Sequence, residues 1–125
     1  MIKLMFALRR RPEMTREEFQ RYWREHHAPL VRDHAAALAI RRYVQVHAVS
    51  NETSRLLATG RGSEPDQFDG LAELWFDSLE AMRAAAATPQ GRAAGRALLE
   101  DERRFIDLPR SPVWLGEEHP IVASP

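Results

Sequence analysis

The chain has 125 residues, 18 basic and 18 acidic side chains, and no cysteine. This length is typical of one compact domain spanning residues 1–125, and the balanced charge disfavours a nucleic-acid partner or an anionic membrane surface. The lack of cysteine excludes disulfides, thiolate metal sites and a cysteine nucleophile, and no apolar run approaches the roughly 18 residues of a membrane span.

The first predicted element is a strand over residues 2–9, where apolar side chains alternate with others. No apolar segment of a secretory signal precedes it, so we expect a cytoplasmic protein.

The second predicted element is a helix that Thr15 opens with a capping box. Pro29 disfavours helical geometry at the residue before it, so we expect an end or kink there and a continuation to about residue 39. On a regular helix His26 lies within the apolar stripe, where it is expected to pack with Phe19 and Trp23, and His27 lies on its margin.

Alternation and capping residues predict the rest of the chain. In order, the elements are a strand over 41–49, a loop over 50–68, a strand over 70–77, helices over 79–87 and 90–105, and a short strand over 111–118. A loop as long as 50–68 is typically functional or mobile. The order β-α-β-β-α-β predicts a ferredoxin-like α+β fold, with a four-stranded antiparallel sheet covered by helices on one face.

The strands also predict what covers the other face of the sheet. We expect the uniformly apolar sets to face the helices: Ile2, Leu4, Phe6, Leu8, Val44, Val46, Ala48, Ala72, Leu74 and Phe76. The opposite face would then carry Met5, Ala7, Tyr43, Gln45, His47, Leu71, Glu73 and Trp75. That face is too apolar for water, which predicts that a second copy of the chain covers it.

Four stretches carry a family resemblance. They are MTREEFQRYWREHHAPL (14–30), RYVQVH (42–47), DGLAELWFDSLEAM (69–82) and DERRFID (101–107). In this order they resemble the EthD-domain family of the dimeric α/β-barrel superfamily. The resemblance implies a homodimer whose sheets pack face to face around pockets lined by the inner strand faces. It also implies a small aromatic or polyketide-like ligand, and chemistry of the lyase or oxidoreductase kind.

The same resemblance places the family's two histidines on His27 and His47, and its acidic motif on Asp101 and Glu102. His47 is the strongest candidate for an acid/base group, because an imidazole gains or loses a proton near neutral pH. We expect Glu73, on the same sheet face, to orient it. His27 and Tyr43 would hydrogen-bond a phenol or carbonyl. The expected substrate contacts are Met5, Tyr22, Gln45, Trp75 and Asp101.

Structural alternatives exist for these residues. A His47–Glu73 pair could instead be buried at the dimer seam, and His27 could bond the terminal carbonyls of its helix. Asp101 could be an ordinary salt-bridged helix residue, and the aromatic side chains could simply pack in the core or the interface.

We therefore expect a homodimer that binds a small aromatic molecule, and a cofactor-free enzyme that uses histidine for acid/base chemistry. The reaction would be decarboxylation, dehydration, cyclisation or oxygenation. No metal site is expected, because no histidine or carboxylate spacing matches one. The alternatives are a non-catalytic binding or accessory protein of an oxygenase system, and a haem-binding dimer with His47 as axial ligand.

Overall fold

The structure is a computed structural model that describes residues 1–123. Its sheet has the strand order β2-β3-β1-β4, with every neighbouring pair antiparallel. The strands are β1 (Ile2–Leu8), β2 (Arg42–His47), β3 (Gly70–Phe76) and β4 (Val113–Gly116). The predicted ferredoxin-like α+β fold is therefore confirmed.

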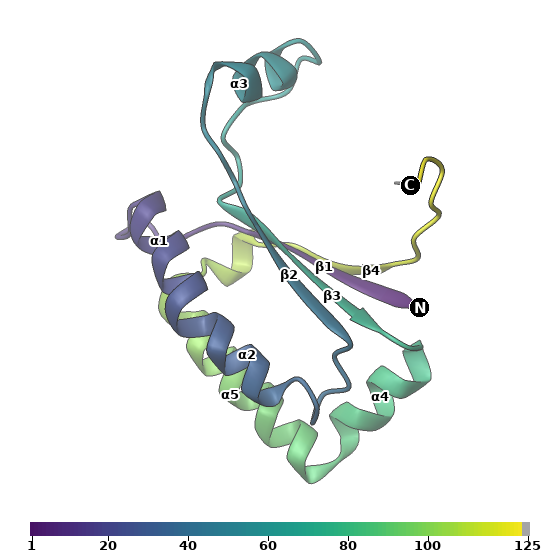
Figure 1. Cartoon of the computed structure of the whole chain (residues 1–125). Coiled ribbons are helices and arrows are strands. Elements are labelled where there is room, and N and C mark those ends of the chain that lie inside the picture. The colour runs from purple at the N-terminus through teal and green to yellow at the C-terminus, as the bar shows by residue number, and fades with distance from the viewer. Residues whose placement is uncertain (124–125) are drawn as a thin grey trace.

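The helices lie mainly on one face of this sheet (Figure 1). They are α1 (Arg16–Tyr22), η1 (Trp23–His27), α2 (Ala28–His34), α3 (Glu52–Thr59), α4 (Leu79–Ala87), α5 (Pro89–Phe105) and the 3-10 turn η2 (Leu108–Arg110). The core between the layers is built from Leu8, Phe19, Trp23, Ala72, Phe105 and Ile106. Within residues 1–123, no helix is both long enough and apolar enough to cross a bilayer.

Where an end or kink was predicted near Pro29, the structure has one π-helical turn, η1, and the helix continues into α2, which ends at His34 and not near residue 39. In this turn the N–H of Ala28 bonds the carbonyl of Trp23, five residues earlier. In an α-helix, a residue four positions later lies slightly more than one full turn further round the axis. In the wider π turn it lies slightly less than one full turn further. The two angular shifts cancel along this helix. Residues spaced by four consequently form one buried row: Phe19, Trp23, His27 and Val31.

The π turn places His27 at the cavity, as the family resemblance implied, but it does not place His26 in the core. His27 is buried in the row, whereas the His26 side chain is 57% exposed and packs against Tyr22 with the rings tilted and their centroids 4.6 Å apart. The prediction that His26 packs with Phe19 and Trp23 is therefore wrong, because it assumed a regular helix.

The predicted faces of β2 are also wrong. Tyr43 lies opposite Leu74 and Gln45 opposite Ala72, so these β2 residues face the helices. Val44 and Val46 lie on the open face instead, which makes that face more apolar than predicted. Alternation separates the two faces of a strand but does not say which one is inside.

Residues 50–68 are not the predicted loop throughout, because they contain α3. Asn51 begins this helix by accepting a hydrogen bond from the Ser54 N–H at 2.8 Å, a capping signal readable in the sequence. Figure 1 shows α3 extending away from the sheet, and its Leu56 and Leu57 are exposed.

Candidate active site

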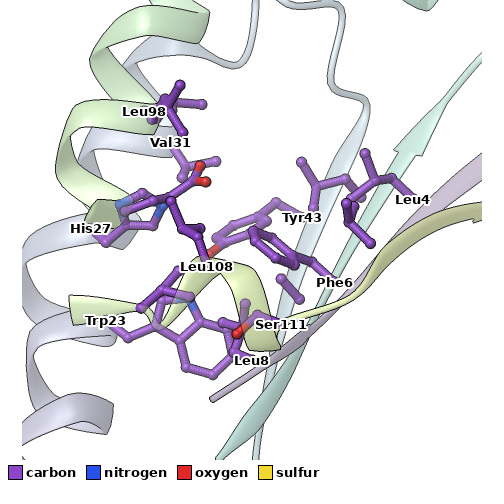
Figure 2. Close-up of a pocket in the computed structure, with 16 residues that line it drawn as sticks. Leu4, Phe6, Leu8, Trp23, His27, Val31, Tyr43, Leu98, Leu108 and Ser111 are labelled. Carbon is purple, nitrogen blue, oxygen red and sulfur yellow. The ribbon is translucent and has the colours of Figure 1, made fainter. Parts of the chain in front are cut away.

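A cavity of about 450 Å³ lies between the sheet and the helices (Figure 2). The sheet side consists of Leu4, Phe6, Leu8, Tyr43, Ala72, Leu74 and Val113. The helical side and the segment before β4 add Trp23, His27, Val31, Leu98, Leu99, Glu102, Ile106, Leu108 and Ser111. This volume is in the range that holds a small organic ligand, and mostly apolar walls with a few polar groups are typical of such sites.

His27 is the first polar group of the cavity, and it is held from behind by Asp101. Their Nδ1 and Oδ2 atoms are 2.7 Å apart, and both side chains are buried. The other carboxylate oxygen of Asp101 accepts a hydrogen bond from the Tyr22 hydroxyl at 2.5 Å. Asp101 therefore lies behind His27 and does not line the cavity. Tyr22 does not line it either, and its hydroxyl bonds Asp101. Neither residue has the predicted position of a substrate contact.

The charges of this pair follow from burial and hydrogen bonding. Burial lowers the pKa of His27, and the Asp101 interaction only partly opposes it. Burial works against ionisation of Asp101, but hydrogen bonds from Tyr22 and His27 outweigh it and hold the pKa of Asp101 below its usual range. His27 is thus neutral at neutral pH and carries its proton on Nδ1, toward an acceptor-only carboxylate. Its Nε2 is left as a proton acceptor.

Tyr43 contributes the second polar group, from the sheet side of the cavity (Figure 2). Burial raises the pKa of Tyr43 to about 12, so its hydroxyl stays protonated. Gln45 Nε2 donates to this hydroxyl at 2.8 Å and to the Trp23 carbonyl at 2.9 Å. Since the Tyr43 oxygen already accepts this bond, its own O–H is free to donate to a ligand.

His47, predicted as the main acid/base group, lies behind the cavity and does not line it. Its Nε2 is 2.8 Å from Gln45 Oε1, and its ring stacks on Trp23 with centroids 4.5 Å apart. The hydrogen bonds connect His47 to Tyr43 only through Gln45. Gln45 is likewise a positioning residue, and not a wall of the cavity as its predicted role required.

Glu73, Met5 and Trp75 lie on the opposite face of the sheet from this cavity. Glu73 is paired with Val44 and Met5 in the register and forms an ion pair with Lys3 at 3.3 Å. The predicted His47–Glu73 pair is therefore wrong, because the two side chains emerge from opposite faces. Met5 and Trp75 cannot be the predicted walls of this cavity for the same reason.

Glu102 is the cavity residue whose role the sequence interpretation missed. Burial raises the pKa of its carboxyl to about 7, and the negative charge of Asp101 adds to this effect. The signal was available, because Glu102 is the one charged residue in a four-residue spacing that runs from Ala94 and Leu98 of α5 to Ile106, just after the helix.

No side chains within residues 1–123 form a group of three or more that could hold a metal ion. The polar groups of the cavity are those of His27, Tyr43, Glu102 and Ser111, which suit hydrogen bonding and proton transfer to an organic molecule.

Sheet order and a one-sided helical layer define a ferredoxin-like α+β domain. Residues 11–109 match the EthD domain, and the chain belongs to that family. Solved structures agree on the fold. An EthD family protein from Bacillus halodurans is 24% identical with a TM-score of 0.61, covering 95% of this chain and 100% of its own.

Two further structures are similar at lower identity. An EthD-like protein from Ralstonia eutropha is 18% identical, with a TM-score of 0.60 and coverage of 98% of this chain and 95% of its own. A protein from Bacteroides fragilis, described as dimeric and ferredoxin-like, is 14% identical, with a TM-score of 0.58 and coverage of 94% and 95%. At these identities the likeness shows the shared fold alone.

Proposed function

We propose that this protein binds a small aromatic molecule in the cavity and acts on it by histidine-mediated acid/base chemistry without a cofactor. One observation carries the proposal: His27 lines the cavity while its Nδ1 is 2.7 Å from a buried carboxylate. A histidine fixed in this tautomer presents Nε2 to the ligand as a base, the arrangement that many enzymes use to position a catalytic imidazole.

The other groups supply binding and orientation. Tyr43 donates its hydroxyl proton to a carbonyl or phenol oxygen of the ligand, and the apolar walls favour aromatic rings. Exclusion of water strengthens these polar contacts. Decarboxylation, dehydration, cyclisation and substrate-activated oxygenation all involve a proton transfer that His27 could perform.

The haem hypothesis receives no support from the position of His47. Its Nε2 is engaged by Gln45, and Trp23 covers one face of its ring. A binding or accessory protein without turnover remains the second hypothesis, since the apolar cavity alone would serve that role.

We also propose that the protein is a homodimer joined through the open faces of its sheets. The supporting observation is the apolar character of that face, where Val46 is 45% and Trp114 48% exposed. The Bacteroides fragilis relative with the same fold is described as dimeric.

The enzyme hypothesis is tested with a panel of aromatic ketones, phenols and quinols, measuring binding by calorimetry and turnover by product analysis. We expect His27→Gln to lower turnover at least about 100-fold, the usual contribution of a general base, with binding changed only a few-fold. His34→Gln, at the end of α2 and outside the cavity, is the matched control and should act as the wild type does. Full turnover in His27→Gln would contradict the proposal, and tight binding without turnover in the wild type would favour the accessory role.

A further inference from the structure

Glu102 occupies a position where an apolar residue would be expected. It lies one turn after Leu98 on α5 and four residues before Ile106, which follows the end of the helix, and all three line the cavity. Leu98 is 9% exposed and Ile106 2%. An ionisable group in such a row costs free energy unless it has a partner. Glu102 is half-buried, and within residues 1–123 no hydrogen bond or ion pair engages its carboxyl.

The two adjacent carboxyls of α5 therefore have different environments. Asp101 is hydrogen-bonded by Tyr22 of α1 and His27 of η1, whereas Glu102 borders the cavity. Besides Asp101, the titratable groups around Glu102 are His27 from η1 and Tyr43 from β2, which line the same cavity. The pKa of Asp101 is lowered and that of Glu102 is raised to about 7. The pKa of His27 is lowered as well, so the cavity lining holds a neutral imidazole and a carboxyl that keeps its proton up to about pH 7, which can act as a base and an acid together.

The cavity walls also limit the kind of ligand. Among the described residues, no lysine or arginine lines the cavity, so an anionic ligand would find no opposite charge there. The Ser111 hydroxyl is engaged by the Arg9 N–H and the Asp107 carbonyl. The remaining polar groups are a basic nitrogen, a neutral phenol and a carboxyl that can carry a proton. A neutral molecule with one carbonyl oxygen satisfies the phenol and the carboxyl at once.

We propose that Glu102 is a catalytic general acid that works with His27 as the base, and that the substrate is a neutral aromatic ketone that undergoes enolisation. This inference rests on the proposed function above and adds a residue and a substrate class to it.

The step is a balanced proton transfer. His27 Nε2 removes a proton from the carbon next to the carbonyl, and the C–H electron pair forms the new carbon–carbon double bond. The carbonyl π pair moves onto oxygen, which takes the proton from the Glu102 carboxyl. Tyr43 donates a second hydrogen bond to that oxygen. The products are the enol, protonated His27 and ionised Glu102, and no oxidant or reductant is needed.

The test uses 2-tetralone, an aromatic ketone with exchangeable hydrogens beside its carbonyl. The protein is incubated with it in D2O, and deuterium incorporation is followed by NMR while binding is measured by calorimetry. We expect Glu102→Gln to lower the exchange rate at saturating probe at least about 100-fold and to change the Kd less than three-fold. The pH profile of kcat/KM should fall above about pH 7 in the wild type, where Glu102 loses its proton, and Glu102→Asp should restore part of the rate.

Glu100→Gln is the matched control, because Glu100 is exposed on the same helix; it should leave exchange unchanged. Glu102→Gln is nearly isosteric, so the fold should persist, which a melting curve verifies. Wild-type exchange in Glu102→Gln, together with loss in His27→Gln, would overturn the role of Glu102 and leave the proposed function intact. Binding of the probe without exchange by the wild type would overturn both the acid role and the ketone class, but not ligand binding. Failure to bind the probe would overturn the ketone class.

Discussion

At the scale of single residues, Glu102 should make stability depend on pH. Its pKa in the folded chain is raised from 4.5 to about 7, so the unfolded chain releases the proton first as the pH rises. The free energy of unfolding should therefore fall between about pH 4.5 and pH 7, and the full loss should be present above that range. The protonated Glu102 carboxyl therefore avoids this loss of stability only below about pH 7.

Glu102→Gln should remove this loss. We expect the variant to be more stable than the wild type by about 1–3 kcal/mol at pH 8 and nearly equal to it at pH 4.5, as measured by thermal and urea unfolding. Glu100→Gln, on the exposed side of α5, should show no such pH-dependent difference. An equal effect of Glu102→Gln at both pH values would mean that the carboxyl does not titrate abnormally.

The residues of the site were only partly predictable. His27, Tyr43 and Asp101 were identified from the sequence, and the structure brings them to or behind one cavity. The predicted pairing of His47 with Glu73 required both side chains to lie on the same face of the sheet. The register between β2 and β3 decides this, and the alternation within one strand does not. The sequence interpretation assigned the substrate contact to Asp101 and not to Glu102, because a pair of adjacent carboxyls does not show which of the two faces the cavity.

At the scale of elements, local signals predicted most boundaries. The capping box at Thr15 and the cap at Ser78 both open helices where expected, because these signals lie within one helical turn. The π turn was not predictable from them. Its effect is to move His27 into the buried row by one position. Helix periodicity alone placed His26 there, whereas the family resemblance favoured His27.

The packing of η1 on the sheet depends on the lack of a side chain at Gly70. A Cβ there would lie 2.4 Å from the Trp23 ring and 2.9 Å from the Val46 carbonyl oxygen. Trp23 forms part of the cavity wall and stacks on His47, so it has little freedom to move. Gly70→Ala should therefore destabilise the fold by about 1–3 kcal/mol and weaken ligand binding, as measured by unfolding and calorimetry.

Gly95→Ala is the matched control for this prediction. A Cβ at Gly95, within α5, meets nothing within 4 Å, so alanine should instead raise helix stability by about 0.5–1 kcal/mol. If both substitutions had the same sign, the contact of Gly70 with Trp23 would not limit packing.

At the scale of the whole molecule, the sheet separates two apolar surfaces. The cavity lies on the helix-facing side, and the open side carries Val44, Val46, Leu71 and Trp114. Because both surfaces are apolar, the sequence alone did not show which face of β2 lines the cavity and which lies on the open side of the sheet.

This separation predicts that dimerisation and ligand binding can be uncoupled. Val46→Lys places a charge on the open face, and two-fold symmetry would bring it into the interface twice. We expect the mass in sedimentation equilibrium to fall from twice 14.3 kDa to 14.3 kDa, whereas Ala93→Lys, exposed on α5, should leave the dimer intact.

Because the cavity is built from the helix-facing side of one chain, the monomeric variant should still bind ligand with a Kd within a few-fold of the wild type. A wild-type monomer at micromolar concentration would refute the dimer, and loss of binding on dissociation would mean that the partner completes the site.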